Sequence, residues 1–258
     1  FEGEYLNGKR SGKGKEYYYY SDGELKFEGE YIDGKKWNGK GYNKEGKIEF
    51  EIKEGNGKGK EYYINDELEY EGEYINGERN GKVKEYNNDG KLEYEGEYIN
   101  GERNGKGKEY NKYGELIFEG EYLNGKRNGK GKEYYSDGKL KFEGEYLNEK
   151  KNGKGKEYYS DCKLKFEGEY LNGKIWDGKG YNKEGKIEFE IKEGNGKGKE
   201  YYINDELEYE GEYINGERNG KVKEYNNDGK LEYEGEYING ERNGKGKEYN
   251  KYGELIFE

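Results

Sequence analysis

The 258-residue chain contains no histidine, no proline and no methionine, and its single cysteine is Cys162. Without histidine, histidine-based acid–base catalysis and imidazole metal sites are excluded. One cysteine cannot form a disulfide within the chain, which fits a reducing compartment without requiring one. The absence of proline leaves the backbone N–H groups free to donate in a sheet ladder. The chain has no run of about 18 apolar residues, so no transmembrane helix is predicted.

The composition is strongly polar, with 28% hydrophobic residues, 41% charged residues and a net charge of −11. Such a composition is typical of disordered chains. The 33 tyrosines argue otherwise, because they recur at fixed positions and each can bury its ring while its hydroxyl stays hydrated. We therefore expect a thin structure with an aromatic core. The negative charge predicts repulsion of nucleic acid and of anionic membrane surfaces.

A short motif, [FY]-E-G-E-Y, recurs along the whole chain, mostly at a spacing of 24 residues. Such a period is the signature of a repeat architecture in which each repeat contacts its neighbours. We interpret residues 1–258 as one continuous array of about eleven repeats of 20–26 residues. The array starts in repeat phase and stops within a motif, so we expect it to be a segment of a longer chain. The motif begins at Phe1, Phe27, Tyr70, Tyr94, Phe118, Phe142, Phe166, Tyr209 and Tyr233, with degenerate copies at Phe50 and Phe189 and a partial one at Phe257.

A longer period of 139 residues is superimposed on the short one, since residues 39–119 are identical to residues 178–258. Each 139-residue block holds one repeat marked by Trp37 or Trp176, followed by a shortened 20-residue repeat. Selection for a regular ruler or fibre would give this identity, and so would recombination between near-identical repeats. The tryptophans are expected to pack in the core of this spacer, or to mark a bend or a contact surface.

Within one repeat, residues 92–99 alternate strictly between two faces, with Tyr94, Gly96 and Tyr98 on one face and glutamates on the other. This is the pattern of a strand with one covered face. The Asn100-Gly101 pair that follows supplies the positive φ angles of a tight hairpin turn. The predicted fold is therefore all-β, an elongated single-layer meander of stacked antiparallel β-hairpins.

One register for this hairpin sets Tyr98 across from Gly107 and Glu97 across from Lys108. It places an aromatic ring over a glycine and an opposite-charge pair on the exposed face. Tyr110 does not fall on the aromatic face in this register, which points to a bulge or to a different pairing.

The repeat pattern resembles the MORN (membrane occupation and recognition nexus) repeat, and in particular its variant type. The matching positions in one repeat are Tyr94, Gly96, Tyr98, Gly101, Gly105 and Gly107. The resemblance covers the whole chain and implies hairpins stacked into a twisted rod. It also implies scaffolding, dimerisation or attachment as the function. Because some family members were proposed to bind phosphoinositide lipids, the resemblance also implies lipid binding as a possible role. The variant repeat is often described as part of an antitoxin, which implies binding to a partner protein.

A basic cluster around one loop, formed by Lys126, Arg127, Lys130 and Lys132, is the candidate contact for an anion or lipid headgroup. Its Gly-Lys-Gly-Lys run lacks the spacing and the hydroxyl of a phosphate-binding loop. The alternative is a strand edge bridged by ion pairs, because acidic residues lie alongside. Paired glutamates recur in every repeat, which favours a solvated charge ladder over acid–base catalysis.

Cys162 stands at a turn position that glycine holds in the preceding repeat, at Gly138. A side chain with positive φ is uncommon, so Cys162 is expected to strain its turn.

No catalytic, cofactor-binding or metal-ligating residue is predicted, so the chain is expected to be non-enzymatic. The favoured hypothesis is a structural scaffold, an extended β rod that self-associates end to end or laterally and assembles into filaments. The alternatives are a phosphoinositide or membrane-surface binding module and a protein-binding, antitoxin-like or targeting module. A protein partner ranks above a membrane lipid, and no nucleic acid is expected. The sequence does not determine localisation and leans only weakly towards the cytoplasm.

Overall fold

A computed structural model describes residues 1–19 and 23–258, and every regular element in these ranges is a β-strand. The same ranges contain no helix that could cross a membrane. The chain divides into two compact units, residues 1–126 and 127–258. In each unit consecutive strands pair antiparallel, which confirms the predicted all-β meander of hairpins.

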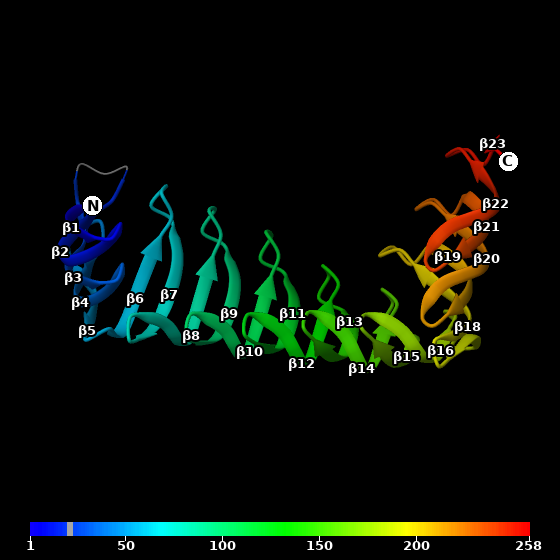
Figure 1. Cartoon of the computed structure of the whole chain (residues 1–258), viewed down its shortest axis with the longest axis horizontal. Coiled ribbons are helices and arrows are strands. Elements are labelled where there is room, and N and C mark those ends of the chain that lie inside the picture. Colours follow the sequence, from blue (N-terminus) through cyan, green and yellow to red (C-terminus); the bar gives the residue numbers. More distant parts are fainter. Residues whose placement is uncertain (20–22) are drawn as a thin grey trace. The chain divides into compact units, whose positions relative to one another are not determined.

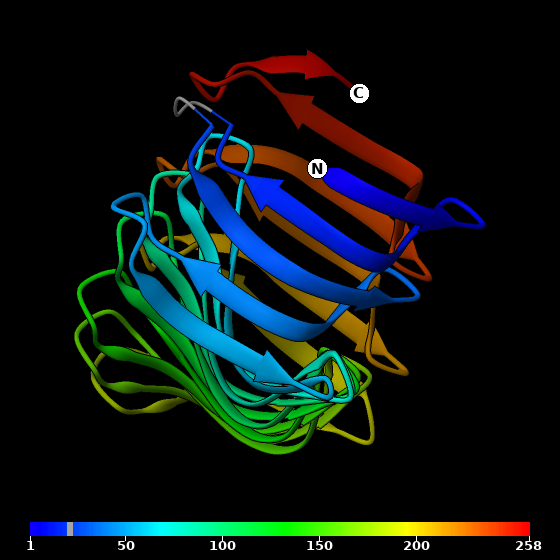
Figure 2. The same cartoon turned by 90° about the vertical axis from the view of Figure 1, so that its left-hand side faces the viewer.

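The first unit is a run of hairpins in which every strand pairs with the next one along the chain. Figure 1 shows its later strands, β6 to β11, as successive hairpins side by side. In Figure 2 its strands β1 to β5 lie next to one another, each curved along its length. The strands are β1 (Glu2–Leu6), β2 (Lys9–Tyr17), β3 (Leu25–Ile32), β4 (Lys35–Tyr42), β5 (Ile48–Lys53), β6 (Asn56–Tyr62), β7 (Leu68–Ile75), β8 (Glu78–Tyr86), β9 (Leu92–Ile99), β10 (Glu102–Tyr110) and β11 (Leu116–Leu123).

The second unit repeats this order, again with each strand paired to its successor. Its first strand, β12, begins at Lys126, the last residue of the first unit. The strands are β12 (Lys126–Tyr134), β13 (Leu140–Leu147), β14 (Lys150–Tyr158), β15 (Leu164–Leu171), β16 (Lys174–Tyr181), β17 (Ile187–Lys192), β18 (Asn195–Tyr201), β19 (Leu207–Ile214), β20 (Glu217–Tyr225), β21 (Leu231–Ile238), β22 (Glu241–Tyr249) and β23 (Leu255–Phe257).

The hairpin tips are two-residue turns, and most of them are built on Asn-Gly pairs. Asn100 and Gly101 have φ angles of 51° and 84°, the pair of positive values that a type I′ turn requires. The N–H of Gly101 also donates to the carbonyl of Arg79 in the preceding tip, at 2.9 Å. The tip glycine therefore closes its own hairpin and joins it to its neighbour.

The register differs from the predicted one. Gly107 lies across from Gly96, and Tyr98 lies across from Arg103, so the expected pairing of Tyr98 with Gly107 is wrong. The pairing shifts between Arg103 and Gly107, where Gly105 has a φ of 73°. This bulge adds residues to one strand only. An aromatic residue still faces a glycine, but in the next hairpin, where Tyr122 lies across from Gly105.

Tyr110 also lies beside an irregularity, since the pairing of β10 with β11 shifts between Glu109 and Tyr110. Of the two alternatives that the sequence left open for Tyr110, the different pairing is found within the β9–β10 hairpin, and a bulge is found where β10 pairs with β11.

The core is a file of aromatic rings lying on facing glycines. Tyr94 is fully buried, and Cβ atoms built on Gly96 and Gly107 would lie 2.4 and 2.3 Å from its hydroxyl. Glycine at both positions leaves room for the ring in this pair. Tyr98 packs edge-on against Tyr94 at 6.1 Å, and Tyr94 packs edge-on against Tyr122 of the next repeat at 5.5 Å. Such edge-to-face pairs are favourable beyond the area they bury, so the rings join consecutive repeats.

The shortened repeats are organised around the two tryptophans. Trp37 is half-buried and covers the tip glycine Gly55, where an added Cβ would lie 2.8 Å from the indole ring. The N–H of Gly55 donates to the Trp37 carbonyl at 2.7 Å. Trp176 and Gly194 form the same arrangement in the second unit. The tryptophans thus pack against the tips of the shortened repeats, half-buried rather than within the buried core that the sequence led us to expect.

Cys162 has a φ of 68° and is exposed, so it holds the left-handed conformation expected from its turn position. That conformation costs roughly 1–2 kcal/mol for a residue with a Cβ. We expect Cys162→Gly to raise the free energy of unfolding by about 0.5 kcal/mol, because the added freedom of glycine in the unfolded chain offsets part of the relief. Urea denaturation followed by circular dichroism measures this. A loss of stability would show that the thiol makes a contact that stabilises the turn.

Candidate functional site

The most extensive polar feature is a ladder of glutamate, arginine and tyrosine side chains on the aromatic face. Glu85 accepts hydrogen bonds from the Tyr98 hydroxyl and from Arg103, the latter at 2.6 Å. Arg103 also lies 3.5 Å from Glu109, which accepts from the hydroxyl of Tyr122 at 2.7 Å. Each glutamate therefore binds groups from the following repeat.

The same arrangement recurs in both units. A lysine replaces the arginine in some repeats, and Lys151 pairs at 2.7 Å with Glu157 of its own repeat, as Arg103 does with Glu109. Further members are the pairs Glu61 with Tyr74 and Arg79, Glu133 with Tyr146 and Arg127, Glu200 with Tyr213 and Arg218, and Glu224 with Tyr237 and Arg242.

The guanidinium groups of the ladder also cover the aromatic core. Arg103 lies 4.0 Å from the centroid of the Tyr94 ring, and Arg79 lies 4.2 Å from that of Tyr70. An arginine over a tyrosine face is favourable, and more so when partly desolvated. One arginine thus contacts a ring of its own repeat and a glutamate of the preceding one.

The electrostatic environment holds the ladder charged. Burial by itself would raise the pKa of Glu61, but the hydrogen bond and charge of Arg79 outweigh it, so this pKa lies below its usual value. Burial likewise opposes the charge of Arg103, yet Glu85 keeps its pKa above the ordinary one. Burial, together with the hydrogen bond to Glu85, raises the pKa of Tyr98 to about 12. The tyrosine therefore remains a neutral hydrogen-bond donor at physiological pH.

The raised pKa of Tyr98 predicts loss of stability in alkali. A tyrosine titrates near pH 10 in an unfolded chain, while Tyr98 in the folded chain titrates at about 12. The folded state therefore holds this proton more tightly, and the resulting stability is full below pH 10 and is lost as the pH rises towards 12. We expect the urea midpoint to fall over this interval, more steeply in the native chain than in Tyr98→Phe. Equal slopes in the two proteins would contradict the prediction.

A second polar cluster joins each shortened repeat to the repeat that precedes the tryptophan-marked one. Asp205 lies in the turn after β18 with 7% of its surface exposed. Its carboxylate accepts from the N–H and hydroxyl of Ser160, at 3.1 and 2.6 Å, and lies 3.6 Å from the ammonium of Lys183. Tyr159 packs edge-on against Tyr201 beside it, at 5.6 Å. Ser160 lies in the turn between β14 and β15, and Asp205 lies in the turn between β18 and β19 at the end of the shortened repeat. The aspartate therefore connects two repeats that are not neighbours, across the Trp176 repeat between them.

The first unit contains an equivalent connection through Asp66. This residue is 6% exposed, and it accepts from the N–H of Tyr19 at 2.9 Å. Asp66 and Asp205 have φ angles of 63° and 66°, at a turn position where the ordinary repeats have glycine, as at Gly114. At the end of each shortened repeat, aspartate replaces this turn glycine, and its side chain reaches across the tryptophan-marked repeat.

Removing the Asp205 side chain while keeping its turn tests this connection. We expect Asp205→Gly to lower the free energy of unfolding by about 1–2 kcal/mol, because the lost charged hydrogen bonds outweigh the relief of backbone strain. Cys162→Gly is the matched control, since it relieves the same kind of strain with no such connection to lose. Both variants are measured by urea denaturation. If Asp205→Gly is stabilising like the control, the aspartate does not brace the repeats.

The basic cluster predicted as an anion or lipid contact is divided between two environments. Lys126, Lys130 and Lys132 are exposed, and Lys130 and Lys132 lie across from Glu145 and Glu143. Arg127 has a side chain only 22% exposed and belongs to the ladder, 3.9 Å from both Glu133 and Glu149. The acidic neighbours match the alternative of an ion-paired strand edge. Anion or lipid binding at the three lysines stays a prediction.

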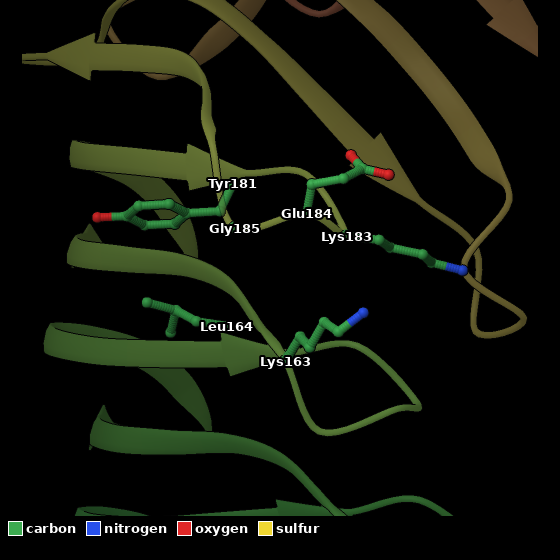
Figure 3. Close-up of a pocket in the computed structure, with 6 residues that line it drawn as sticks. All are labelled: Lys163, Leu164, Tyr181, Lys183, Glu184 and Gly185. Atoms are coloured by element: carbon green, nitrogen blue, oxygen red, sulfur yellow. The ribbon is translucent and has the colours of Figure 1, made fainter.

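No group of three or more acidic or cysteine side chains suited to a metal ion occurs in the described ranges. A shallow hollow lies between two turns of the second unit, lined by Lys163, Leu164, Tyr181, Lys183, Glu184 and Gly185. In Figure 3, Leu164 and Tyr181 extend to one side of these turns and the two lysine ammonium groups to the other. The polar and apolar groups that line the hollow therefore do not point towards one position where a ligand could sit.

The six repeat positions singled out from sequence all have structural roles, as the preceding contacts show. The charged members of the ladder were missed. A signal for them existed, because an arginine or lysine follows the tip at the same place in most repeats and a glutamate precedes the last tyrosine of the hairpin. For Asp205 the signal was an aspartate at a turn-glycine position.

Comparison with protein families places seven copies of the MORN repeat on the chain, at residues 1–23, 70–90, 94–112, 118–139, 142–161, 209–229 and 233–251. No curated protein matches the chain. Among solved structures, selenomethionine-substituted virginiamycin B lyase from Staphylococcus aureus is 17% identical over 86% of this chain and 69% of its own, with a TM-score of 0.20. TcdB2-TccC3 without its hypervariable C-terminal region is 11% identical over 96% of this chain and 16% of its own, with a TM-score of 0.17. Neither likeness carries an argument about function. The family matches cover more than half of the chain and coincide with its hairpins, and the chain belongs to the MORN repeat family.

Proposed function

We propose that the chain is a non-enzymatic structural scaffold that self-associates and assembles into filaments. A MORN repeat protein of this kind fits a structural or a binding role. The observation that favours the structural role is the ladder, because the recurring polar groups of the aromatic face are engaged with neighbouring repeats. Glu85, for example, binds Tyr98 and Arg103 of the following repeat. Side chains held in this way are not available to a substrate.

The surface that remains exposed is repetitive. Lys106 lies across from Glu121, and Lys154 lies across from Glu169 in the second unit, so lysines and glutamates alternate from strand to strand. Exposed pairs of this kind contribute little to stability individually. Many equivalent weak contacts nevertheless add up when two repetitive surfaces meet. Repetition therefore suits assembly better than recognition of one small molecule.

Sedimentation velocity of the full chain over a wide concentration range tests self-association, and negative-stain electron microscopy tests filament formation. We expect the sedimentation coefficient to rise with concentration and filaments to form at the highest concentrations. A monomer at every concentration would contradict the scaffold proposal. Association that stops at a closed dimer would retain the scaffold and contradict the filament.

Binding to vesicles is the competing outcome. The chain would then pellet with phosphoinositide vesicles, and a triple variant carrying Lys126→Gln, Lys130→Gln and Lys132→Gln would not. This result would support the membrane-surface module instead. Capture of one stoichiometric protein partner by a monomeric chain would support the targeting module.

A further inference from the structure

The hairpin tips of the second unit carry exposed aliphatic side chains. The residue before each regular tip turn is about half exposed, at 49% for Leu147, 48% for Leu171, 47% for Ile214 and 52% for Ile238. Each of them follows a buried or half-buried tyrosine and so points to the opposite face of its strand. A regular series of exposed Leu and Ile is unusual on a solvated surface and is typical of a contact region.

The tips form a continuous row because each is hydrogen-bonded to the one before it. Gly173 donates to Lys151 at 2.8 Å, and Gly240 donates to Arg218 at 2.9 Å. The row also continues through the shortened repeat, where Gly194 donates to Trp176 at 2.6 Å and Gly216 donates to Gly194 at 2.8 Å. We call this series, from Leu147–Lys150 to Ile238–Glu241, the tip row.

The charges along the tip row are segregated by sign. The residue after the turn is Lys150 and then Lys174 in the two tips before the shortened repeat, and Glu217 and then Glu241 in the two tips after it. Lys174 and Glu217 form an ion pair across the shortened tip. The row is therefore basic in its first half and acidic in its second half.

The first unit has the same order, with Lys9 and Lys35 before its shortened repeat and Glu78 and Glu102 after it. Lys35 and Glu78 again pair across the shortened tip, at 2.6 Å. One further tip, ending in Lys126, closes this unit.

Two acidic side chains interrupt the basic halves, and both are already ion-paired within the chain. Asp33 lies 2.7 Å from Lys9, and Glu149 lies 3.9 Å from Arg127.

We propose that the tip row is the surface through which two copies of this chain associate, with the rows running in opposite directions. Reversal places the basic half of one row against the acidic half of the other, so that Lys150 faces Glu241 of the second copy at each end. At the centre, the intrachain Lys174–Glu217 pairs of the two copies lie side by side in opposite orientation. Two rows running in the same direction would place like charges together, which is unfavourable. The opposed arrangement is self-complementary, as a two-fold interface requires.

The aliphatic side chains supply the contact that charge alone does not. Exposed ion pairs are screened by salt and contribute little singly, whereas apolar area removed from water is stabilising. In the opposed rows the Leu and Ile side chains lie between the charged positions. The charges then set the direction of the rows, and the aliphatic residues hold them together.

A second copy satisfies the whole row better than a polyanion or an anionic lipid surface. Either of these would be attracted by the basic half and repelled by the acidic half. This inference rests on the proposed self-association, and it adds the surface and the direction of that association.

Two charge variants of the full chain test it. The acidic-tip variant carries Lys9→Glu, Lys35→Glu, Lys150→Glu and Lys174→Glu, and the basic-tip variant carries Glu78→Lys, Glu102→Lys, Glu217→Lys and Glu241→Lys. All eight positions are exposed or half-exposed, and circular dichroism checks that each variant is folded. Sedimentation velocity is measured for each variant alone, for an equimolar mixture and for the native chain, at low and high salt.

We expect each variant alone to associate roughly tenfold or more weakly than the native chain, because all its altered tips repel. The equimolar mixture should recover association, and high salt should weaken it. Native association that persists unchanged in both separate variants would overturn the tip-row inference while leaving self-association intact. A native chain that stays monomeric would overturn both.

The aliphatic contribution is tested independently by Leu147→Ser, Leu171→Ser, Ile214→Ser and Ile238→Ser in one chain. We expect this variant to associate more weakly than the native chain at both low and high salt, because the lost contact is apolar and does not depend on charge screening. An unchanged association constant would contradict the aliphatic contact.

Discussion

Replacing Gly96 with alanine is expected to lower the free energy of unfolding by about 3 kcal/mol, the upper part of the range for overpacking a tight site. The added Cβ would lie 2.4 Å from the Tyr94 hydroxyl and 2.7 Å from both the Gly107 Cα and the Lys106 carbonyl oxygen. Two of these three atoms are backbone atoms of the paired strand, so the strands themselves would have to separate. Urea denaturation measures the loss, and hydrogen exchange locates it in β9 and β10.

Gly107→Val is the matched control, and it is expected to cost at most about 1 kcal/mol. The chain already contains this change, because Val83 faces Gly72 in the equivalent pair and is buried beside the fully buried Tyr70. One strand of the pair therefore tolerates a side chain as long as the other keeps its glycine. If Gly96→Ala and Gly107→Val lowered the free energy of unfolding equally, the backbone contacts at Gly96 would not be the cause of the larger loss expected there.

Glu85→Ala is expected to lower the free energy of unfolding by about 2–3 kcal/mol. The glutamate accepts from Tyr98 and Arg103 and lies 3.6 Å from Arg79. Its removal leaves a buried hydroxyl and two half-buried guanidinium groups without that partner, and removing one member of a buried ion pair is strongly destabilising. The partial exposure of Arg103, 28% of its side chain, keeps the effect below that of a fully buried pair.

Glu93→Ala provides the comparison for this variant, since Glu93 is an exposed glutamate on the opposite face of β9. Its effect should stay within about 0.5 kcal/mol. A double-mutant cycle of Glu85→Ala with Arg103→Met isolates the coupling between the two side chains. A loss at Glu85 no larger than that at Glu93, or a coupling near zero, would contradict a role for the ladder in joining repeats.

The ladder also distinguishes this array from a sheet held by hydrophobic burial alone. Its core is one layer of rings, Tyr94 and its equivalents, lying on glycines. Without Glu85, which comes from the neighbouring repeat, the Tyr98 hydroxyl would lose its acceptor and Arg103 would keep only its ion pair with Glu109. A single repeat therefore lacks both its ring contacts and its hydrogen-bond partners, which is the physical reason the hairpins stack.

The predicted hairpin content was correct because it depends on neighbouring residues. Alternation around Tyr94 and Tyr98 identifies a strand, and Asn100-Gly101 identifies its turn, without knowledge of any distant contact. The expected strain at Cys162 belongs to the same class, since it follows from one turn position. The register was wrong because the bulge at Gly105 displaces the pairing, and alternation within a strand does not reveal an inserted residue in its partner.

The sequence by itself determined the repeat, its strands, its turns and the absence of histidine chemistry, because local backbone geometry and composition are sufficient for these. Only the tertiary structure decided which charges are buried. Glu85 and Glu93 are both glutamates within strands, yet Glu85 lies in the ladder and Glu93 is exposed to water. Asp205 and Ser160 meet across the turn between β16 and β17, and the tip charges of the second unit lie along one row. These relations join residues from different hairpins, and the distances between them are fixed by bulges, loop lengths and stacking rather than by the pattern within a repeat.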